Sequence, residues 1–217
     1  MPHGYNSKLL YVDLGHETYK MLALPNEILK KYIGGRGLGA KLYWDLIPPK
    51  VDPLGPENVF MVLTGPFSGT MAPGAAKHLI VTKSPATSGW LESYSSGRMA
   101  SEIKYAGYDG LIIDGKAKHP ISLLIKDDDV EFSDARHLWG KGAFDTETYI
   151  RENFDPECGT LSIGPAGENL LPFAGVGSEY FRKAGRGGAG AVMGSKNLKT
   201  VAIKGSKGIS CADISAL

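Results

Sequence analysis

The chain has 217 residues, of which 42% are hydrophobic and 22% are charged, and its formal net charge is +1 at pH 7. A chain of this size can bury a real core, as one domain or as two closely packed halves. The near-neutral charge gives no general attraction to nucleic acid. The first residues are polar and no long apolar run follows, so the sequence predicts neither a signal peptide nor a membrane segment.

The first part of the chain predicts two strands followed by two helices. The strands are expected over 9–14 and near 19–22, and Asn26 is expected to cap a helix that runs through Tyr32. Glycines at 34–37 interrupt this helix before an amphipathic run over 38–46. Four prolines between positions 48 and 56 then predict a rigid, extended connection.

The middle and end of the chain are richer in strands than in helices. Apolar runs at 59–63, 79–82, 111–113, 161–163 and 201–203 predict strands, and 121–126 pairs with 130–132 as a hairpin around three aspartates. One longer helix is expected over 146–154. Because short turns join most of the strands, we predict an α+β fold with largely antiparallel sheet.

The sequence also contains an internal repeat. Gly65-Pro66 follows one strand and Gly164-Pro165 follows another, and each is succeeded by a glycine-led helical stretch and a further strand. Such duplication can supply two similar anion sites, although repetition can also be purely architectural.

The glycine-rich stretch from Arg182 to Lys196 is the strongest candidate for a binding site. Its glycines let backbone amides approach a ligand, and Arg182 and Arg186 add forked donors suited to phosphate. The stretch satisfies G-x-G-x-x-G, but no convincing strand precedes it and no acidic ribose partner follows, which disfavours a dinucleotide fold. The residue order of a P-loop is absent as well. A turn needed only for tight packing remains the alternative.

Several long motifs of the chain resemble the N-terminal domain of the tungsten-dependent aldehyde:ferredoxin oxidoreductases. The matching segments are 33–38 (IGGRGL), 51–58 (VDPLGPEN), 82–85 (TKSP), 104–109 (KYAGYD), 163–169 (IGPAGEN) and 184–199 (AGRGGAGAVMGSKNLK). They occur in the family's order and extend the resemblance from about residue 8 to residue 207.

The resemblance implies a duplicated, pseudo-twofold domain of largely antiparallel sheets with short glycine-led helices. It implies two pterins that together hold one tungsten or molybdenum atom, with magnesium at the pterin phosphates. The cofactor-binding positions carried over from the family are Lys77, Tyr94, Ser95, Ser96, Gly97, Arg182, Lys183, Gly185 and Arg186. At Lys77 the family usually has an arginine, so the charge is kept and the planar fork is lost. An asparagine is more usual within the segment 94–97.

The family's [4Fe-4S] cluster is ligated by cysteines of later domains, and Cys158 and Cys211 cannot form such a site. The sequence therefore predicts no catalytic residue and no metal ligand in this chain. We expect residues 1–207 to be the tungsten–pterin-binding domain and 208–217 to begin a truncated following segment. The two distant cysteines favour a reduced, cytoplasmic protein.

The function implied is oxidation of aldehydes to carboxylic acids, with electrons passing through the cluster to ferredoxin. The remaining domains of the same enzyme and ferredoxin are the expected partners, and a homodimer stays open. Two alternatives remain: a family member with another redox reaction, such as carboxylate or aryl thioester reduction, or a stand-alone pterin-binding or carrier module without turnover.

Overall fold

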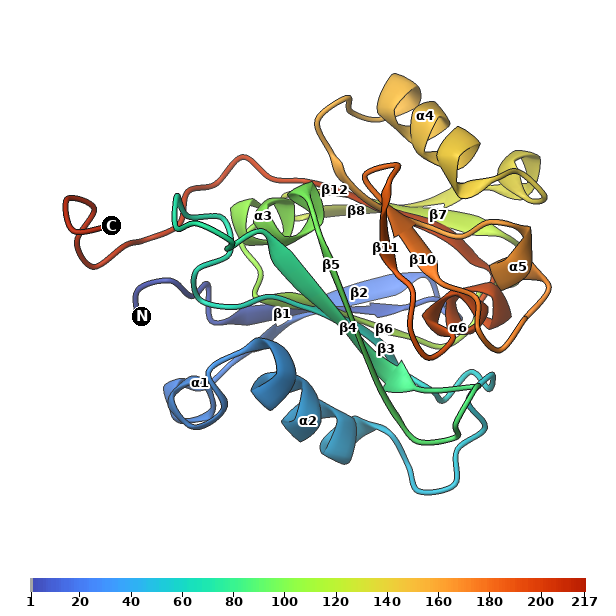
Figure 1. Cartoon of the computed structure of the whole chain (residues 1–217), viewed down its shortest axis with the longest axis horizontal. Coiled ribbons are helices and arrows are strands. Elements are labelled where there is room, and N and C mark those ends of the chain that lie inside the picture. Colours follow the sequence, from blue (N-terminus) through green and yellow to red (C-terminus); the bar gives the residue numbers. More distant parts are fainter. Residues whose placement is uncertain (1) are drawn as a thin grey trace.

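The computed structural model describes residues 2–217, which form two six-stranded sheets with helices on both faces of each (Figure 1). Within this part of the chain parallel pairing is confined to β1 with β6 and β7 with β12, and the other ladders are antiparallel. The predicted α+β class with largely antiparallel sheet is therefore confirmed.

The first sheet has the strand order β2-β1-β6-β3-β4-β5. Its strands are β1 (Lys8–Asp13), β2 (Thr18–Ala23), β3 (Phe60–Leu63), β4 (Lys77–Lys83), β5 (Trp90–Ser96) and β6 (Gly110–Asp114). The helices of this half are α1 (Asn26–Tyr32), α2 (Gly35–Leu46) and α3 (Arg98–Tyr105).

The second sheet has the order β11-β10-β9-β12-β7-β8. Its strands are β7 (Ile121–Lys126), β8 (Asp129–Asp134), β9 (Gly159–Ser162), β10 (Val176–Ser178), β11 (Arg182–Ala184) and β12 (Leu198–Lys204). A short 3-10 turn (Arg136–Leu138), α4 (Ala143–Asn153), α5 (Pro165–Glu168) and α6 (Ala189–Ser195) belong to this half.

The two halves have the same topology. If β7 to β12 are read as repeats of β1 to β6, the strand order of the second sheet reproduces that of the first, including the parallel pair. Each half has helix between its hairpin and its third strand, and each has a glycine-led helix before its last strand. The predicted duplication is therefore a property of the fold.

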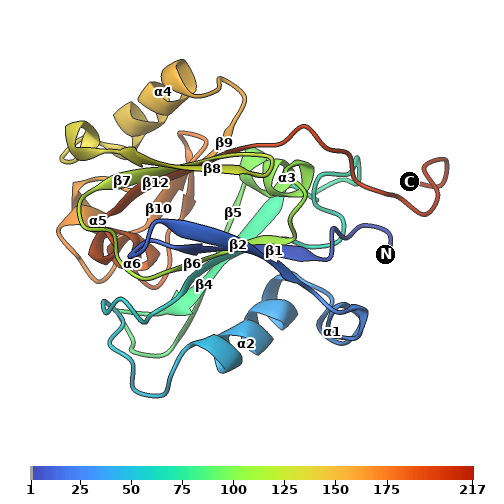
Figure 2. The same ribbon diagram turned by 180° about the vertical axis from the view of Figure 1, so that it is seen from behind.

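The sheets and helices are stacked in layers around a shared core. Helices α1 and α2 cover the outer face of the first sheet and α4 covers the outer face of the second, as seen from both sides in Figures 1 and 2. The largest apolar cluster lies between the sheets and draws side chains from both. Helix α3 packs on β9 and β12 of the other half, and α6 packs on β4. The halves therefore interlock around one core.

Two local predictions were wrong. Pro25 occupies the N-cap of α1 and no side chain caps that helix, so Asn26 lies in its first turn. The proline-containing connection is a series of hydrogen-bonded turns, closed by bonds such as Val51 N to Pro48 O and Gly55 N to Asp52 O. Proline at the second position of a turn has the backbone angle that the turn needs, which explains why these prolines bend the chain.

The aspartate-rich hairpin turn forms as predicted, between β7 and β8. Asp127 accepts hydrogen bonds from Ser206, and Asp128 accepts one from Lys207 at 2.8 Å. After Lys204 the chain forms no further helix or strand up to residue 217, and the expected boundary at residue 207 stays a prediction. Among the helices of residues 2–217, none is both long and apolar enough to span a bilayer.

Candidate functional site

The two sheets meet where edge strand β5 contacts edge strand β11. We call this junction the seam. Two hydrogen bonds cross it: Arg182 Nη1 donates to Ser96 Oγ at 2.6 Å, and the backbone N–H of Arg186 donates to Ser93 Oγ at 3.1 Å. The seam therefore brings together residues that are 86 and 93 positions apart in the sequence, one segment coming from each half of the duplicated fold.

Tyr94 and Lys183 occupy equivalent positions on the two sides of the seam. From each of them, two steps across the paired strands lead to the residue that lies two positions before a Gly-Pro pair. The ladders run Tyr94–Leu79–Leu63 in the first half and Lys183–Gly177–Ser162 in the second. The seam thus follows the pseudo-twofold relation between the halves.

An open hollow of about 650 Å³ lies along the seam. It is lined by Arg36, Glu92, Ser93, Tyr94, Lys183, Gly185 and Arg186. Arg36 Nε donates to Glu92 Oε2 at 2.7 Å, and this carboxylate raises the pKa of the Arg36 guanidinium above its ordinary value. Lys183 and Arg186 are exposed. Three cationic side chains therefore face one carboxylate, a balance that suits an anion.

A second hollow of about 450 Å³ lies at the start of α3. Gly97 is the N-cap of this helix at φ 115°, and no side chain caps it. A side chain at Gly97 would be strained at that φ and would lie 2.3 Å from Glu179 Cγ. Arg98 and Arg182 line the hollow together with two carboxylates, Glu102 and Glu179, so its positive and negative side chains are balanced.

The start of α6, unlike that of α3, is enclosed by neighbouring backbone. A Cβ at its N-cap, Gly188, would lie 2.0 Å from the carbonyl oxygen of Pro172, and Gly190 N–H already donates to Ala174 O. Every residue of α6 is buried. The amino end of this helix is therefore enclosed, and the exposed part of the glycine-rich stretch lies before it, at Arg182, Lys183, Gly185 and Arg186.

Lys77 and Ser95 lie beside the seam on the β4–β5 ladder. Lys77 pairs with Ser96 and lines a smaller hollow of about 220 Å³ together with Tyr94. Ser95 is buried and its hydroxyl has no partner, as is true of both ring nitrogens of its cross-strand neighbour His78. Because neighbouring side chains on a strand alternate, Ser95 faces the core while Tyr94 faces the hollow.

Eight of the nine predicted cofactor-binding positions thus lie at the seam or line the hollows beside it, whereas the side chain of the ninth, Ser95, is buried in the core. The structure also places Arg36 in the main hollow. Glu92 and Ser93 line the same hollow and were not predicted from the sequence. The period-two alternation along β5 was the available signal, since Glu92 shares a face of the strand with Tyr94.

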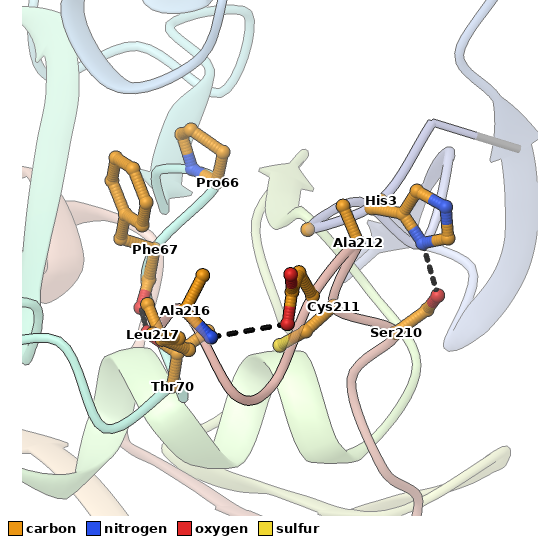
Figure 3. A pocket seen from close by; sticks show the side chains of 11 residues that line it. His3, Pro66, Phe67, Thr70, Ser210, Cys211, Ala212, Ala216 and Leu217 are labelled. Carbon is orange, nitrogen blue, oxygen red and sulfur yellow. Dashed lines mark hydrogen bonds between the residues drawn. The ribbon is translucent and has the colours of Figure 1, made fainter.

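A further cavity of about 380 Å³ lies elsewhere, between the two ends of the described chain. Figure 3 shows its lining, in which His3 Nδ1 bonds to Ser210 Oγ at 2.7 Å and the aromatic ring of Phe67 lies near Pro66. No lysine or arginine contributes to this lining. Its mainly apolar surface does not suit an anion.

The described part of the chain contains no cluster of the side chains that usually bind metal ions. Among residues 2–217 no group of three or more His, Cys, Asp or Glu side chains is arranged to hold a metal ion. Cys158 is buried, and burial raises the pKa of its thiol to about 12, so it stays protonated. The donor set at the seam is cationic and hydroxylic, and it fits a phosphate-bearing group.

Several known proteins are similar to this chain. The family model described as "Aldehyde ferredoxin oxidoreductase, N-terminal domain" matches residues 9–205. The "Tungsten-containing aldehyde ferredoxin oxidoreductase" of Pyrococcus furiosus is 43% identical over 212 residues, which are 97% of this chain and 35% of that protein. The "Aliphatic sulfonate oxidoreductase, WOR-like subunit" of the same organism is 44% identical, over 94% of this chain and 35% of the relative.

A solved structure is also similar. It is titled "Active site complex BamBC of Benzoyl Coenzyme A reductase in complex with 1,5 Dienoyl-CoA", and it matches with a TM-score of 0.94 and 38% identity, covering 97% of this chain and 32% of that one. This chain therefore spans about a third of the length of the proteins that it matches.

Proposed function

This chain belongs to the family of aldehyde ferredoxin oxidoreductase N-terminal domains, and we propose that it holds the phosphate ends of a tungsten–pterin cofactor along the β5–β11 seam. The proposal rests on the junction of the two equivalent strands β5 and β11. There Arg36 of the first half and Lys183 and Arg186 of the second half line one open hollow. A cofactor with two similar pterins would match this pseudo-twofold arrangement.

The residues of the chain have separate roles in this proposal. Arg182 and Arg186 offer forked, permanently charged donors to phosphate oxygens, and Lys183 and Lys77 add point charges. The bond from Arg186 N–H to Ser93 holds the glycine-rich loop against β5. Carbonyl oxygens of the segment 94–97 and of Lys183 are hard ligands of the kind that magnesium prefers, so magnesium at the phosphates is part of the proposal.

When bound, the tungsten–pterin group supplies the redox and oxygen-transfer chemistry, and the protein contributes binding, orientation and charge compensation. We propose that the complete enzyme oxidises aldehydes to carboxylic acids in the cytoplasm and passes electrons through a [4Fe-4S] cluster to ferredoxin. Names of relatives support the aldehyde substrate class and the tungsten. The reacting groups and the cluster ligands would come from the remaining domains of the enzyme.

A reductive reaction on an aryl thioester is the second candidate. It is favoured by the similarity to the benzoyl coenzyme A reductase complex, at 38% identity and a TM-score of 0.94. Assaying the complete enzyme in both directions, with aldehydes plus an oxidised acceptor and with an aryl thioester plus a reduced donor, separates the two reactions.

The test of the binding site is the double variant Arg182→Ala/Arg186→Ala, made in the protein expressed from its complete reading frame and purified without oxygen. Tungsten is measured by mass spectrometry and released pterin by fluorescence. We expect both to fall at least tenfold, because each arginine contributes a charge-assisted contact. Arg136→Ala, an exposed arginine that pairs with Asp134, is the control. Unchanged pterin content in the double variant would defeat the proposal.

A further inference from the structure

The turn that leads into Arg182 is strained. It joins β10 to β11, and both Glu179 and Tyr180 have left-handed backbone angles, at φ 51° and 59°. Three residues, 179–181, join the paired Ser178 and Arg182, and left-handed positions in such hairpin loops normally carry Asn or Gly, because other side chains adopt these angles at a cost. A turn built from Glu and Tyr therefore needs contacts from outside to hold it.

Helix α4 supplies those contacts. Glu147, which is almost fully buried, accepts a hydrogen bond from Tyr180 N–H at 2.8 Å through Oε2 and one from Arg151 Nε at 3.0 Å through Oε1. Arg151 Nη2 in turn donates to Glu179 Oε2 at 3.1 Å. Both left-handed residues of the turn are thus bonded to α4, one through its backbone and one through its side chain.

The remaining groups of Arg151 strengthen the same arrangement. Its Nη1 donates to Pro156 O at 2.6 Å, and the guanidinium lies 5.5 Å from the centre of the Tyr180 ring. The planar fork is therefore engaged on several sides at once, a geometry that a lysine cannot reproduce.

The turn is also one of the places where the second half contacts the first. The side chain of Glu179 lies against Gly97, with no space there for a Cβ, and both residues line the hollow at the start of α3. Arg182, two residues beyond Tyr180, donates to Ser96. A shift of the turn would therefore move Arg182 and the segment that follows it relative to β5.

We propose that Glu147 and Arg151 are positioning residues for the cofactor site: from α4 they fix the β10–β11 turn, and with it the place of Arg182 at the seam. The proposal rests on the proposed function, since it assumes that a phosphate-bearing group binds there. It assigns to α4, on the outer face of the second sheet, a role at a site that it does not line (Figure 1).

The test compares Arg151→Met with Ile150→Ala in the protein expressed from its complete reading frame. Ile150 lies on the same helix and is buried in the small cluster beneath it, so its truncation destabilises α4 without removing a bond to the turn. Released pterin is measured against time after dilution, and thermal unfolding is measured in parallel. We expect Arg151→Met to lose pterin about tenfold faster than the wild type, and Ile150→Ala to lose it at the wild-type rate.

Two further variants keep the test decisive. Arg151→Lys retains a charge that reaches one carboxylate, so its rate of pterin loss should fall between those of the wild type and Arg151→Met. If Arg151→Met does not fold, Glu147→Gln carries the test, because the amide keeps the shape and removes one of the two acceptors.

Pterin loss at the wild-type rate in Arg151→Met, or in Glu147→Gln if that variant carries the test, would overturn the inference. Equally fast loss in Ile150→Ala would also overturn it, since general destabilisation would then explain the effect. Full pterin retention in Arg182→Ala/Arg186→Ala would instead defeat the proposed function itself, and so the two failures are distinguishable.

Discussion

Replacing His78 by valine should remove a large part of the acid sensitivity of the fold. His78 is 1% exposed, and neither ring nitrogen has a hydrogen-bond partner. Burial lowers the pKa of its imidazole from 6.5 to about 4. Valine is chosen because Val176 occupies the position equivalent to His78 in the second half. Val176 and its cross-strand partner Ala184 are apolar and fully buried.

The magnitude and the sign follow from proton linkage. Between pH 6.5 and pH 4 the unfolded chain binds the proton and the folded chain does not, so stability is full above pH 6.5 and is lost as the pH falls. Each pKa unit corresponds to about 1.4 kcal/mol, which makes the contribution of His78 about 3 kcal/mol over this window. In His78→Val that contribution disappears.

Urea unfolding of the purified chain at pH 7, 6, 5 and 4 measures this directly. The unfolding free energy of the wild type should fall by about 3 kcal/mol more than that of His78→Val. Ser95→Ala is the matched control, because it removes a buried polar atom from the cross-strand partner without removing a titrating group. Parallel pH profiles for the wild type and His78→Val would refute the reasoning.

Three other outcomes are expected. Gly194→Ala should cost about 1–3 kcal/mol or more in unfolding free energy, because its Cβ would lie 2.0 Å from a backbone oxygen of α5; a wild-type urea midpoint would contradict this. Lys199→Met should cost about 3–5 kcal/mol by stranding the buried carboxylate of Glu168, and the double variant Lys199→Met/Glu168→Gln should recover part of the loss in the same assay. Native protein treated with iodoacetamide at pH 8 should gain one adduct, at Cys211, because burial raises the pKa of Cys158 to about 12; a second adduct in the mass spectrum would disagree.

Much of the fold was predictable because its signals are local. The Gly-Pro pairs at 65–66 and 164–165 mark the same point in the two halves, and glycines precede both α3 and α6. Apolar runs located most of the strands. The interlocking of the halves had no such signal, since the packing of α3 on β9 depends on contacts between distant segments.

The candidate site was predictable as a set of residues but not as a geometry. The resemblance selected two segments, and only the structure shows that β5 and β11 meet and that Ser95 faces the core. The amino end of α6 is enclosed by Pro172 and Ala174, which sequence patterns could not reveal. Glu147 and Arg151 have the spacing of an ordinary helix ion pair, so nothing marked their contacts with the β10–β11 turn.

The most direct test of the central claim is a crystal structure of the protein expressed from its complete reading frame and purified without oxygen, with tungsten located by its anomalous signal. The account predicts tungsten near the β5–β11 seam, and phosphate oxygens within hydrogen-bond distance of Arg182, Arg186 or the segment 94–97. Tungsten located away from the seam, with only solvent in the hollows, would contradict it.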